Sequence, residues 1–294
     1  MAHSATVAAG SSKERGEAMK TILMADPQRY PHMTTQEIRD TFLLSGLHRP
    51  GAINLFYLDL DRAVVGMAAP ADDSLPLPNP PELRAAYFTE RRELGALNVG
   101  GAGIVHVNGL AHELGNLDLI YIGRGNPEIR FESKSASDSA VFYLLSYPAH
   151  APHPVTVVRK EMAQPSELGS AETCNRRTVY KYIHADGAKS CQLVMGVTHL
   201  DEGSAWNTMP PHTHMRRSEI YFYFDLEDDA RVFHLMGPAD ETRHIVMENR
   251  EAVASPGWSI HAGVGTRAYK FCWGMGGENQ DYADMDPAPI ASLH

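Results

Sequence analysis

The sequence is poor in cysteine. Only Cys174, Cys191 and Cys272 occur among 294 residues, and they are widely spaced. An odd and scattered set argues against a disulfide framework and against a zinc site built from thiolates. We therefore expect reduced, buried thiols in a cytoplasmic protein.

Basic charge and long apolar runs are also scarce. The chain has 26 Lys and Arg residues against 36 Asp and Glu residues, a formal net charge of −10. Nucleic acid is therefore not the expected partner, because phosphate binding requires a basic surface. A small anionic substrate is compatible with this charge, since local arginines decide such contacts. No apolar run approaches the ~20 residues that span a bilayer, and the N-terminus lacks a basic-then-apolar signal pattern.

Long helical periodicity is absent from most of the chain. One segment, TTQEIRDTFLLSG (residues 34–46), predicts a helix. Thr34 or Thr35 can cap it, Glu37 lies in its first turn, and Gly46 is expected to end it.

What remains is a series of short strand-like segments separated by turns, in a chain with 19 prolines and 24 glycines. Many short strands at close spacing predict an all-β sandwich or barrel architecture. The main predicted strands lie within residues 53–68, 103–109, 119–125, 140–147, 191–200, 219–226, 230–237 and 267–275.

A proline-rich seam at residues 147–155 divides the chain. We place a domain boundary there, which predicts a flexible N-terminal extension (1–30), a first barrel (31–150) and a second barrel (151–294). Residues 89–99 resemble residues 214–224, and residues 119–125 resemble residues 259–265. The halves would then be duplicated barrels, with Leu94 at the place of Glu219 and Tyr121 at the place of His261.

A polar cluster stands out in NTMPPHTHMRRSEIYFYFDL (residues 207–226). His212 and His214 are two residues apart, so in a strand both imidazoles point to the same face. Glu219 has the opposite parity, and a turn or bulge at residues 215–218 is needed to bring it to that face. Strict alternation then resumes, with Glu219, Tyr221 and Tyr223 on one face and Ile220, Phe222 and Phe224 on the other.

A third histidine, His261, lies in SPGWSIHAGVG (residues 255–265). Three imidazoles and one carboxylate suit a divalent cation such as Zn²⁺, Mn²⁺, Fe²⁺ or Ni²⁺. A lone His-x-His pair among 15 histidines is a weak signal, but the combination with Glu219 and His261 predicts a metal site. His234 and His244 lack such neighbours, and we interpret them as structural. The GGAG stretch (100–103) lacks the Lys-Ser/Thr of a phosphate loop and predicts a turn.

The spacing His212-x-His214-x4-Glu219, followed by Pro256 and His261, resembles the two metal motifs of the cupin superfamily. Leu226 stands near the place of a usual glycine, and Gly257 follows Pro256 directly. This resemblance leaves the function open, because one fold hosts many activities.

Five longer stretches narrow the resemblance to one family within the superfamily. They are ERRELGALNVGGAG (90–103), CNRRTVYKY (174–182), WNTMPPHTHMRRSEIYFYF (206–224), ETRHIVMENREAVASPGWSIHAGVGTRAY (241–269) and WGMGGENQDYADMD (273–286). They resemble the 5-keto-4-deoxyuronate isomerases (4-deoxy-L-threo-5-hexosulose-uronate ketol-isomerases). The resemblance implies an all-β bicupin with a few short helices and a hexameric, cytoplasmic enzyme of pectin and uronate degradation. It also implies one Zn²⁺ per subunit, held by His212, His214, Glu219 and His261.

The implied reaction converts 5-dehydro-4-deoxy-D-glucuronate to 3-deoxy-D-glycero-2,5-hexodiulosonate, an aldose–ketose isomerisation. A cation that contacts both reacting oxygens would stabilise the enediolate. The base that moves the proton is not identified by the sequence; Tyr221, Tyr223 and a pocket carboxylate are candidates. A metal-assisted hydride shift stays open.

The substrate carboxylate would suit an arginine fork. The pairs Arg176-Arg177 and Arg216-Arg217 are candidates, and neighbours on a strand point to opposite faces, so at most one of each pair faces the pocket. We take Arg177 and Arg217 as candidate substrate-binding residues, with Gln280 from the C-terminal segment.

Three other readings compete with the isomerase. A related cupin isomerase would act on 5-deoxyglucuronate in inositol breakdown. An iron-dependent cupin dioxygenase would use the same four ligands and consume oxygen. A non-catalytic sugar-binding cupin would bind without turnover.

Overall fold

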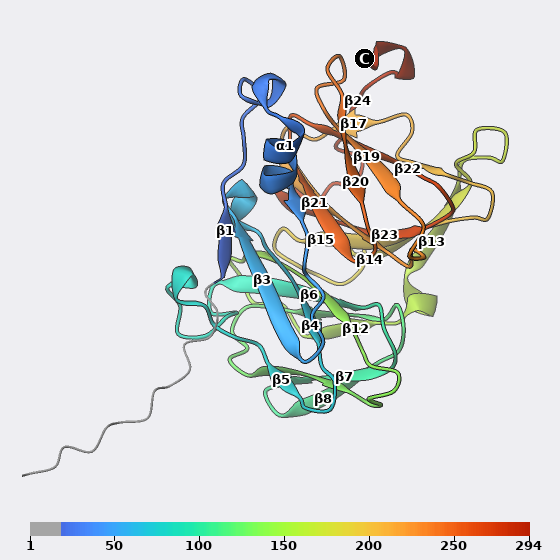
Figure 1. The fold of residues 1–294 in the computed structure, drawn as a ribbon. Coiled ribbons are helices and arrows are strands. Elements are labelled where there is room, and N and C mark those ends of the chain that lie inside the picture. Colours follow the sequence, from blue (N-terminus) through green and yellow to red (C-terminus); the bar gives the residue numbers. More distant parts are fainter. Residues whose placement is uncertain (1–18) are drawn as a thin grey trace, which may run out of the picture.

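The computed structural model describes residues 19–294, and these form two stacked β-barrels (Figure 1). The first eighteen residues of the predicted extension lie outside the described residues. Each barrel combines a seven-stranded sheet with a four-stranded sheet. The predicted all-β, two-barrel architecture is confirmed.

The N-terminal barrel is built mainly from residues between 20 and 158. Its larger sheet has the order β1 (Lys20–Ile22), β3 (Ala52–Leu58), β4 (Val64–Ala69), β11 (Phe142–Pro148), β6 (Arg92–Asn98), β9 (Leu119–Ile122) and β12 (Thr156–Val158). Its smaller sheet has the order β5 (Leu75–Pro76), β10 (Ile129–Ser133), β7 (Gly103–Val107) and β8 (Leu110–Leu114).

The C-terminal barrel repeats this arrangement. Its larger sheet has the order β13 (Gln164–Leu168), β14 (Arg177–Ile183), β15 (Val194–Leu200), β23 (Lys270–Gly277), β18 (Arg217–Phe224), β21 (Glu251–Ser255) and β2 (Leu43–Leu44). Its smaller sheet has the order β16 (Trp206–Asn207), β22 (Ile260–Gly265), β19 (Val232–Gly237) and β20 (Arg243–Met247). A separate pair joins β17 (His212–Thr213) to β24 (Asp286–Pro287).

The inner strands of the two larger sheets have the same order, β4-β11-β6-β9 in one and β15-β23-β18-β21 in the other. Strand β6 is therefore the counterpart of β18 in the repeat. In this register Leu94 pairs with Ile122 and Glu219 pairs with Ser255, so Leu94 occupies the place of Glu219. The predicted equivalence of Tyr121 with His261 is wrong. Tyr121 lies on β9 of a seven-stranded sheet, whereas His261 lies on β22 of a four-stranded sheet. The predicted equivalence rested on similar glycine spacing in the two segments, and glycine spacing carries no information about which strands pair.

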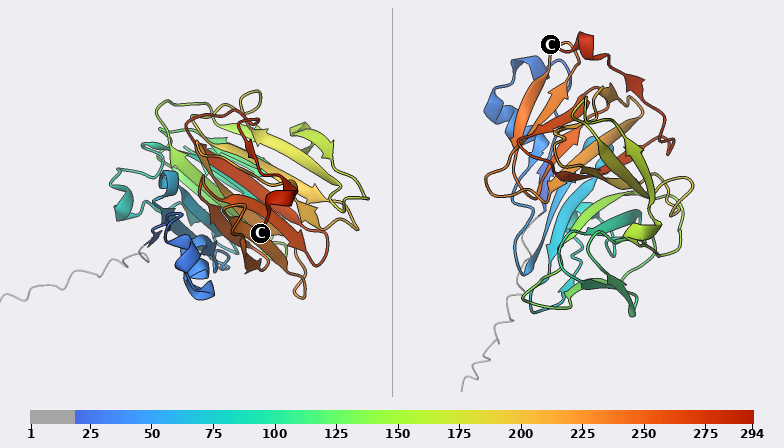
Figure 2. Two further views of the ribbon diagram at one scale, coloured as in Figure 1. Left: turned by 90° about the horizontal axis from the view of Figure 1, so that it is seen from above. Right: turned by 90° about the vertical axis from the view of Figure 1, so that its right-hand side faces the viewer.

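Two segments cross the boundary expected between residues 150 and 151. Strand β12 pairs with β9 of the N-terminal barrel. Strand β2 pairs with β21 of the C-terminal barrel, and the helix α1 (Thr35–Phe42) contacts β21 as well. Figures 1 and 2 accordingly show the blue helix beside the orange strands, away from most of the N-terminal barrel.

The helix is capped as the sequence predicts. The Thr34 hydroxyl accepts from the Glu37 backbone N–H, and the Glu37 carboxylate accepts from the Thr34 N–H. The predicted end at Gly46 is wrong, because the helix stops at Phe42 where β2 begins. The backbone of Leu43 and Leu44 pairs with β21 in place of a further helical turn, so its polar groups are satisfied by the sheet.

Residues 19–30, predicted to belong to a flexible extension, are part of the fold. Strand β1 pairs with β3 in parallel. The Tyr30 side chain is fully buried and its hydroxyl donates to the Met236 carbonyl at 2.9 Å. Five 3₁₀ turns complete the described structure: Tyr30–His32, Leu60–Arg62, Pro81–Leu83, Lys160–Met162 and Ile290–Ser292.

The largest core lies between the barrels and positions the second barrel's inner wall. Ile220, Phe222 and Phe224 point into it from β18. The Phe222 ring stacks on Tyr143 of the other barrel, with ring centroids 4.2 Å apart. The opposite face of β18 is therefore left to line the interior of the C-terminal barrel. No helix among the described residues combines the length and apolarity needed to cross a membrane.

Candidate metal centre

Three of the four clustered residues come from β17 and the start of β18: His212 lies on β17, His214 follows that strand, and Glu219 lies on β18. A turn follows His214, closed by the Arg217 N–H donating to the His214 carbonyl at 3.0 Å. This is the predicted change of parity, and it brings Glu219 to the face that His212 and His214 share. His261 lies near the start of β22 in the smaller sheet.

The four side chains converge on one point. The Nε2 atom of His212 lies 3.0 Å from Nε2 of His214 and 3.1 Å from Nε2 of His261. The Glu219 Oε2 atom lies 3.1 Å from His214 Nε2 and 2.9 Å from His261 Nε2. All four donor atoms lie within 4.8 Å of one another.

Hydrogen bonding fixes how His214 faces the cluster. Its Nδ1 lies 2.8 Å from the Asp284 carbonyl oxygen, which can only accept. Nδ1 therefore carries the proton, and Nε2 presents a lone pair to the other donors. Lone pairs facing one another at about 3 Å repel unless a cation lies between them. Separations near 3 Å are also those of neighbouring ligands with bonds of about 2.1 Å. The donor set fits a divalent metal ion.

Two of these groups, His212 and Glu219, are held in the protonation state that binds metal. Burial, reinforced by the charge of His261, lowers the pKa of His212 to about 3. Burial by itself would raise the pKa of Glu219, but His261 and His214 outweigh it and hold that pKa well below the ordinary value. A neutral imidazole and an ionised carboxylate are the forms in which His212 and Glu219 act as ligands.

A cavity of about 260 Å³ opens onto the cluster. Its polar lining outside the cluster includes Arg177, Thr208, Tyr221 and Tyr282. The Tyr221 hydroxyl bonds to the Thr208 hydroxyl at 2.8 Å. The remaining lining is mostly apolar: Leu168, Val179, Pro210, Phe271, Trp273, Met275 and Met285.

The two tyrosines considered as bases differ in position. Tyr221 lines the cavity, and burial raises its pKa well above the ordinary value. Tyr223 does not line it; its hydroxyl bonds to His234 Nδ1 at 2.8 Å. Neither tyrosine therefore lies in surroundings that favour the phenolate a base would need.

The candidate substrate-binding residues separate in the same way. Arg177 lines the cavity, and its Nη1 donates to the Asn175 carbonyl at 2.9 Å. Arg217 is buried beneath the C-terminal segment and does not line the cavity. Gln280 donates to the Ser190 hydroxyl and to the Leu193 carbonyl, away from the cluster.

Arg176 and Arg216, the first arginines of the two Arg-Arg pairs, each bind an aspartate. Arg176 contacts Asp201 at 2.6 Å, and Arg216 contacts Asp284 at 2.8 Å. Only one arginine of the four lines the cavity, within the limit that strand alternation predicts.

Sequence reasoning missed Thr208, Tyr282 and the Asp284 carbonyl. Thr208 lies in the loop before β17, and Tyr282 lies in the C-terminal segment against Trp273, with ring centroids 5.5 Å apart. No pattern marks them, because loops place these side chains and any residue type supplies a backbone carbonyl.

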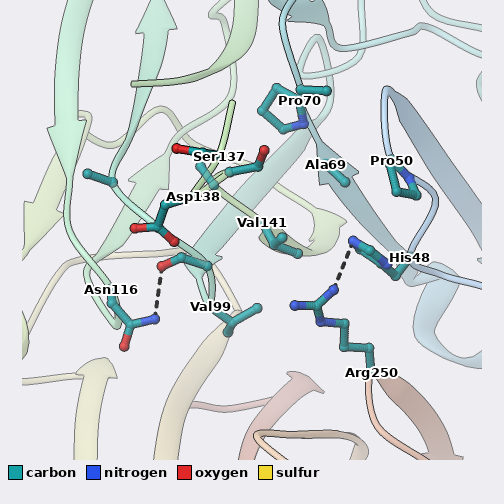
Figure 3. Close-up of a pocket in the computed structure, with 16 residues that line it drawn as sticks. His48, Pro50, Ala69, Pro70, Val99, Asn116, Ser137, Asp138, Val141 and Arg250 are labelled. Atoms are coloured by element: carbon teal, nitrogen blue, oxygen red, sulfur yellow. Dashed lines mark hydrogen bonds between the residues drawn. The ribbon is translucent and has the colours of Figure 1, made fainter. Parts of the chain in front are cut away.

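A larger cavity of about 710 Å³ is lined mainly by residues of the N-terminal half, with Arg250 contributed by the C-terminal barrel (Figure 3). The predicted turn at residues 100–103 contributes to its wall. His48 Nε2 and Arg250 Nη1 lie 2.9 Å apart there, and Asn116 donates to the Gly100 carbonyl. Within the described residues, the group of side chains that could hold a metal ion lies elsewhere, at His212, His214, Glu219 and His261, so that cluster is the better candidate site.

Comparisons with known proteins match most of the chain. The model of the KduI/IolB family matches residues 58–289. A 4-deoxy-L-threo-5-hexosulose-uronate ketol-isomerase from Caldicellulosiruptor bescii is 47% identical over 275 residues, covering 94% of this chain and 100% of the relative. The ketol-isomerase of the same name from Formosa agariphila is 49% identical over 269 residues, covering 92% of this chain and 96% of the relative.

Solved structures match the fold at low sequence identity. An IolB-like protein from Salmonella typhimurium superposes with a TM-score of 0.69 at 14% identity, covering 84% of this chain and 97% of the other. An oxalate decarboxylase from Lactobacillus farciminis superposes with a TM-score of 0.58 at 10% identity, covering 82% and 87%. These likenesses concern the fold alone.

Proposed function

The chain belongs to the KduI/IolB family, and we propose that it is the isomerase named for its relatives, a 4-deoxy-L-threo-5-hexosulose-uronate ketol-isomerase. It would convert 5-dehydro-4-deoxy-D-glucuronate to 3-deoxy-D-glycero-2,5-hexodiulosonate. The observation that carries the proposal is the convergence of His212, His214, Glu219 and His261, three of which line a cavity that is also lined by one arginine.

We propose Zn²⁺ as the ion held by these four residues, one per subunit. Three imidazoles and one carboxylate match the ligands that Zn²⁺ prefers. When bound, the ion supplies Lewis-acid chemistry toward the oxygens of the two carbons between which hydrogen moves. The reaction needs no change of oxidation state, which suits an ion without redox chemistry.

Arg177 is the residue best placed to hold the substrate carboxylate. It lines the cavity, and among residues 19–294 the only hydrogen bond of its side chain runs from Nη1 to the Asn175 carbonyl. The rest of the guanidinium fork is left for a ligand, and a bidentate contact would orient the substrate. Arg217 and Gln280 have protein partners and would act indirectly.

Few side chains in this cavity could carry the proton between the two carbons of the substrate. Outside the four clustered residues, no carboxylate, histidine or lysine lines it within the described chain. Tyr221 is better suited to donate a proton than to remove one, because its pKa is raised by burial. Glu219 or water would then carry the proton, or hydrogen would move as hydride between the two carbons.

We further propose a homo-oligomer, specifically a hexamer, located in the cytoplasm. Both rest on the family resemblance, and the low cysteine content is compatible with a reducing compartment.

The test is an NMR time course in D₂O with freshly prepared 5-keto-4-deoxyuronate. Wild type is compared with chelator-treated protein, with His214→Ala, and with His244→Ala as the matched control, because His244 is exposed on β20. We expect the hydrated aldehyde signal to disappear and a ketose hydroxymethyl signal to grow with wild type and His244→Ala only. Deuterium in the hydroxymethyl group would indicate an enediolate that exchanges with solvent.

An unchanged substrate with metal-loaded wild type would contradict the proposal. Oxygen uptake under the same conditions would then favour the dioxygenase, and saturable binding without turnover would favour a sugar-binding cupin. Faster turnover of 5-deoxyglucuronate would favour the inositol-pathway isomerase.

A further inference from the structure

We propose that Asp284 is a positioning residue for the metal centre: its backbone carbonyl selects the metal-binding tautomer of His214, and its side-chain pair with Arg216 holds that carbonyl in place. The inference rests on the proposed function, because it assumes that the four clustered residues bind a metal ion. It assigns a role to a segment that contributes no ligand.

The segment concerned is residues 278–288, which we name the C-terminal strap. It leaves β23 and returns along the cluster, where β24 pairs with β17 and places Pro287 opposite His212. Figure 1 shows these two strands side by side near the C-terminus. The Glu278 N–H donates to the Arg216 carbonyl and the Ala288 N–H donates to the Pro211 carbonyl, each at 3.0 Å. The strap is thus attached at both ends to the loop that carries the histidines.

The Asp284 carbonyl accepts two hydrogen bonds from buried side chains. His214 Nδ1 lies 2.8 Å away and Arg217 Nη2 lies 2.9 Å away. The side chains of His214 and Arg217 are almost fully buried, at 3% and 2% exposure, so water is a poor substitute for this acceptor.

The same carbonyl prevents a competing hydrogen bond. Arg217 Nη2 also lies 3.2 Å from His214 Nδ1. Because Arg217 can only donate, that contact becomes a hydrogen bond only if Nδ1 loses its proton and Nε2 gains one. A protonated Nε2 cannot bind metal. Among the described residues Arg217 Nε and Nη1 have no partner, so removing the carbonyl would strengthen the competing contact.

The Asp284 side chain anchors the carbonyl from the outer side. Its carboxylate accepts from Arg216 Nε at 2.8 Å, from Arg216 Nη2, and from Asn279 Nδ2 at 2.7 Å. The hydrogen bonds from Arg216 and Asn279 hold the pKa of Asp284 well below its ordinary range. Partly exposed ion pairs contribute little to global stability. The expected effect of breaking this pair is therefore local, on His214, and not a general loss of folding.

The test measures metal affinity without substrate. Asp284→Ala and Arg216→Ala are compared with wild type and with Arg267→Ala, an exposed arginine paired with Glu227 and Asp229 elsewhere on the barrel. The Zn²⁺ dissociation constant of chelator-treated protein is obtained by competition with a chromophoric chelator. Loss of such an orienting contact typically weakens metal affinity 10–100-fold. We expect about 10-fold weaker binding for both strap variants and less than twofold change for Arg267→Ala.

Two further measurements separate positioning from folding. The urea midpoint of the metal-free strap variants should match wild type, and Co²⁺ bound to them should show a shifted ligand-field spectrum. Arg216→Lys keeps the charge but loses the fork, and should restore part of the affinity. The double variant should bind no more weakly than either single variant, because both act through one carbonyl.

Unchanged affinity and an unchanged Co²⁺ spectrum in both strap variants would overturn the inference and leave the proposed function standing. If wild type and His214→Ala bind Zn²⁺ equally weakly, the metal centre itself is refuted. If the strap variants unfold at lower urea and Arg216→Lys binds no better than Arg216→Ala, the role of Arg216 is structural and the inference fails.

Discussion

Hydrogen bonding separates the roles of histidines that lie close together in the second barrel. His214 has one nitrogen bonded to a carbonyl and the other turned toward three further donors. His234 is also fully buried, but its Nδ1 bonds to the Tyr223 hydroxyl and its Nε2 lies 3.5 Å from the Ser255 hydroxyl. Both of its nitrogens face protein groups, so His234 supports the wall behind the cluster.

The buried His234 should make folding stability depend on pH. Burial lowers its pKa from 6.5 to about 3. Below pH 6.5 the unfolded chain binds a proton that the folded chain does not, so stability falls as the pH decreases toward 3. For this one group, linkage predicts a loss of about 2 kcal/mol between pH 7 and pH 5. Urea unfolding of chelator-treated wild type and His234→Gln at both pH values measures it.

The exposed His244 supplies the control for this comparison. His244→Gln should lose as much stability as wild type between pH 7 and pH 5, whereas His234→Gln should lose about 2 kcal/mol less. Equal losses in all three proteins would show that His234 is not kept neutral by the fold.

Arg177 should determine how tightly the substrate is held. A hydrogen bond to a charged group contributes about 1.5–3 kcal/mol, which corresponds to roughly a 10–100-fold fall in kcat/KM. We expect Arg177→Ala to lose this through a higher KM, and Arg177→Lys to lose less because it keeps the charge without the fork. Steady-state kinetics on the uronate measure both.

The neighbouring Arg176 is a matched control, because it is exposed and pairs with Asp201. Arg176→Ala should change KM less than twofold. An unaltered KM in Arg177→Ala would mean that another group binds the carboxylate.

At the scale of elements, β18 serves two parts of the molecule at once. Its inward residues Glu219 and Tyr221 line the candidate site, while Phe222 on the opposite face packs against the other barrel. Strand alternation makes this division unavoidable. The site wall is thus stiffened by a core that contains no site residue.

In the other direction, Glu93 on β6 of the N-terminal barrel stabilises a turn of the C-terminal barrel. Its buried carboxylate accepts hydrogen bonds from the backbone N–H groups of residues 191, 192 and 193, at 2.7–2.9 Å, and from the Tyr121 hydroxyl at 2.8 Å. The turn before β15 therefore has its donors satisfied by a side chain of the other barrel.

Glu93→Gln should destabilise the fold because one acceptor oxygen becomes a donor facing N–H groups. Leaving such buried donors without an acceptor costs about 1–3 kcal/mol. Urea denaturation should detect this loss, while Glu167→Gln on the exposed strand β13 should change stability by less than about 0.5 kcal/mol. A Glu93 variant as stable as wild type would mean that the turn finds other acceptors.

At the scale of the whole molecule, the two barrels share one continuous core and should unfold together. Their sheets approach so closely that a Cβ added at Gly274 would lie 2.1 Å from Leu145 Cδ2. A side chain there would collide with the buried Leu145 side chain, so the close approach of the sheets favours glycine.

Phe222→Ala tests this joint stability. Removing a fully buried phenylalanine typically costs about 3–5 kcal/mol. Because Phe222 stacks on Tyr143 of the other barrel, the loss should appear in a single unfolding transition followed by both tyrosine fluorescence and circular dichroism. Phe233→Ala, which removes a 37% exposed ring from β19, should cost less than about 1 kcal/mol. Two separate transitions would indicate barrels that fold independently.

The sequence by itself determined the features that depend on short-range periodicity. Alternation on residues 219–224 predicts which side chains face inward, the His-x-His spacing predicts a shared face, and the Thr34–Glu37 pair predicts the start of the helix. Each follows from the fixed geometry of a strand or of a helix terminus, which acts over a few residues. The family resemblance extended this to the convergence of His261 with the other three donors.

Tertiary structure alone decided what depends on distant partners. The helix ends at Phe42 because β2 finds β21, some 200 residues away. Tyr121 faces the inter-barrel core because of its sheet, although its local sequence resembles that around His261. Arg217 and Arg177 have similar neighbours in sequence, yet only Arg177 lines the cavity. The Asp284 carbonyl carries no side-chain signature at all. Long-range pairing and backbone groups select these positions, and neither leaves a pattern along the chain.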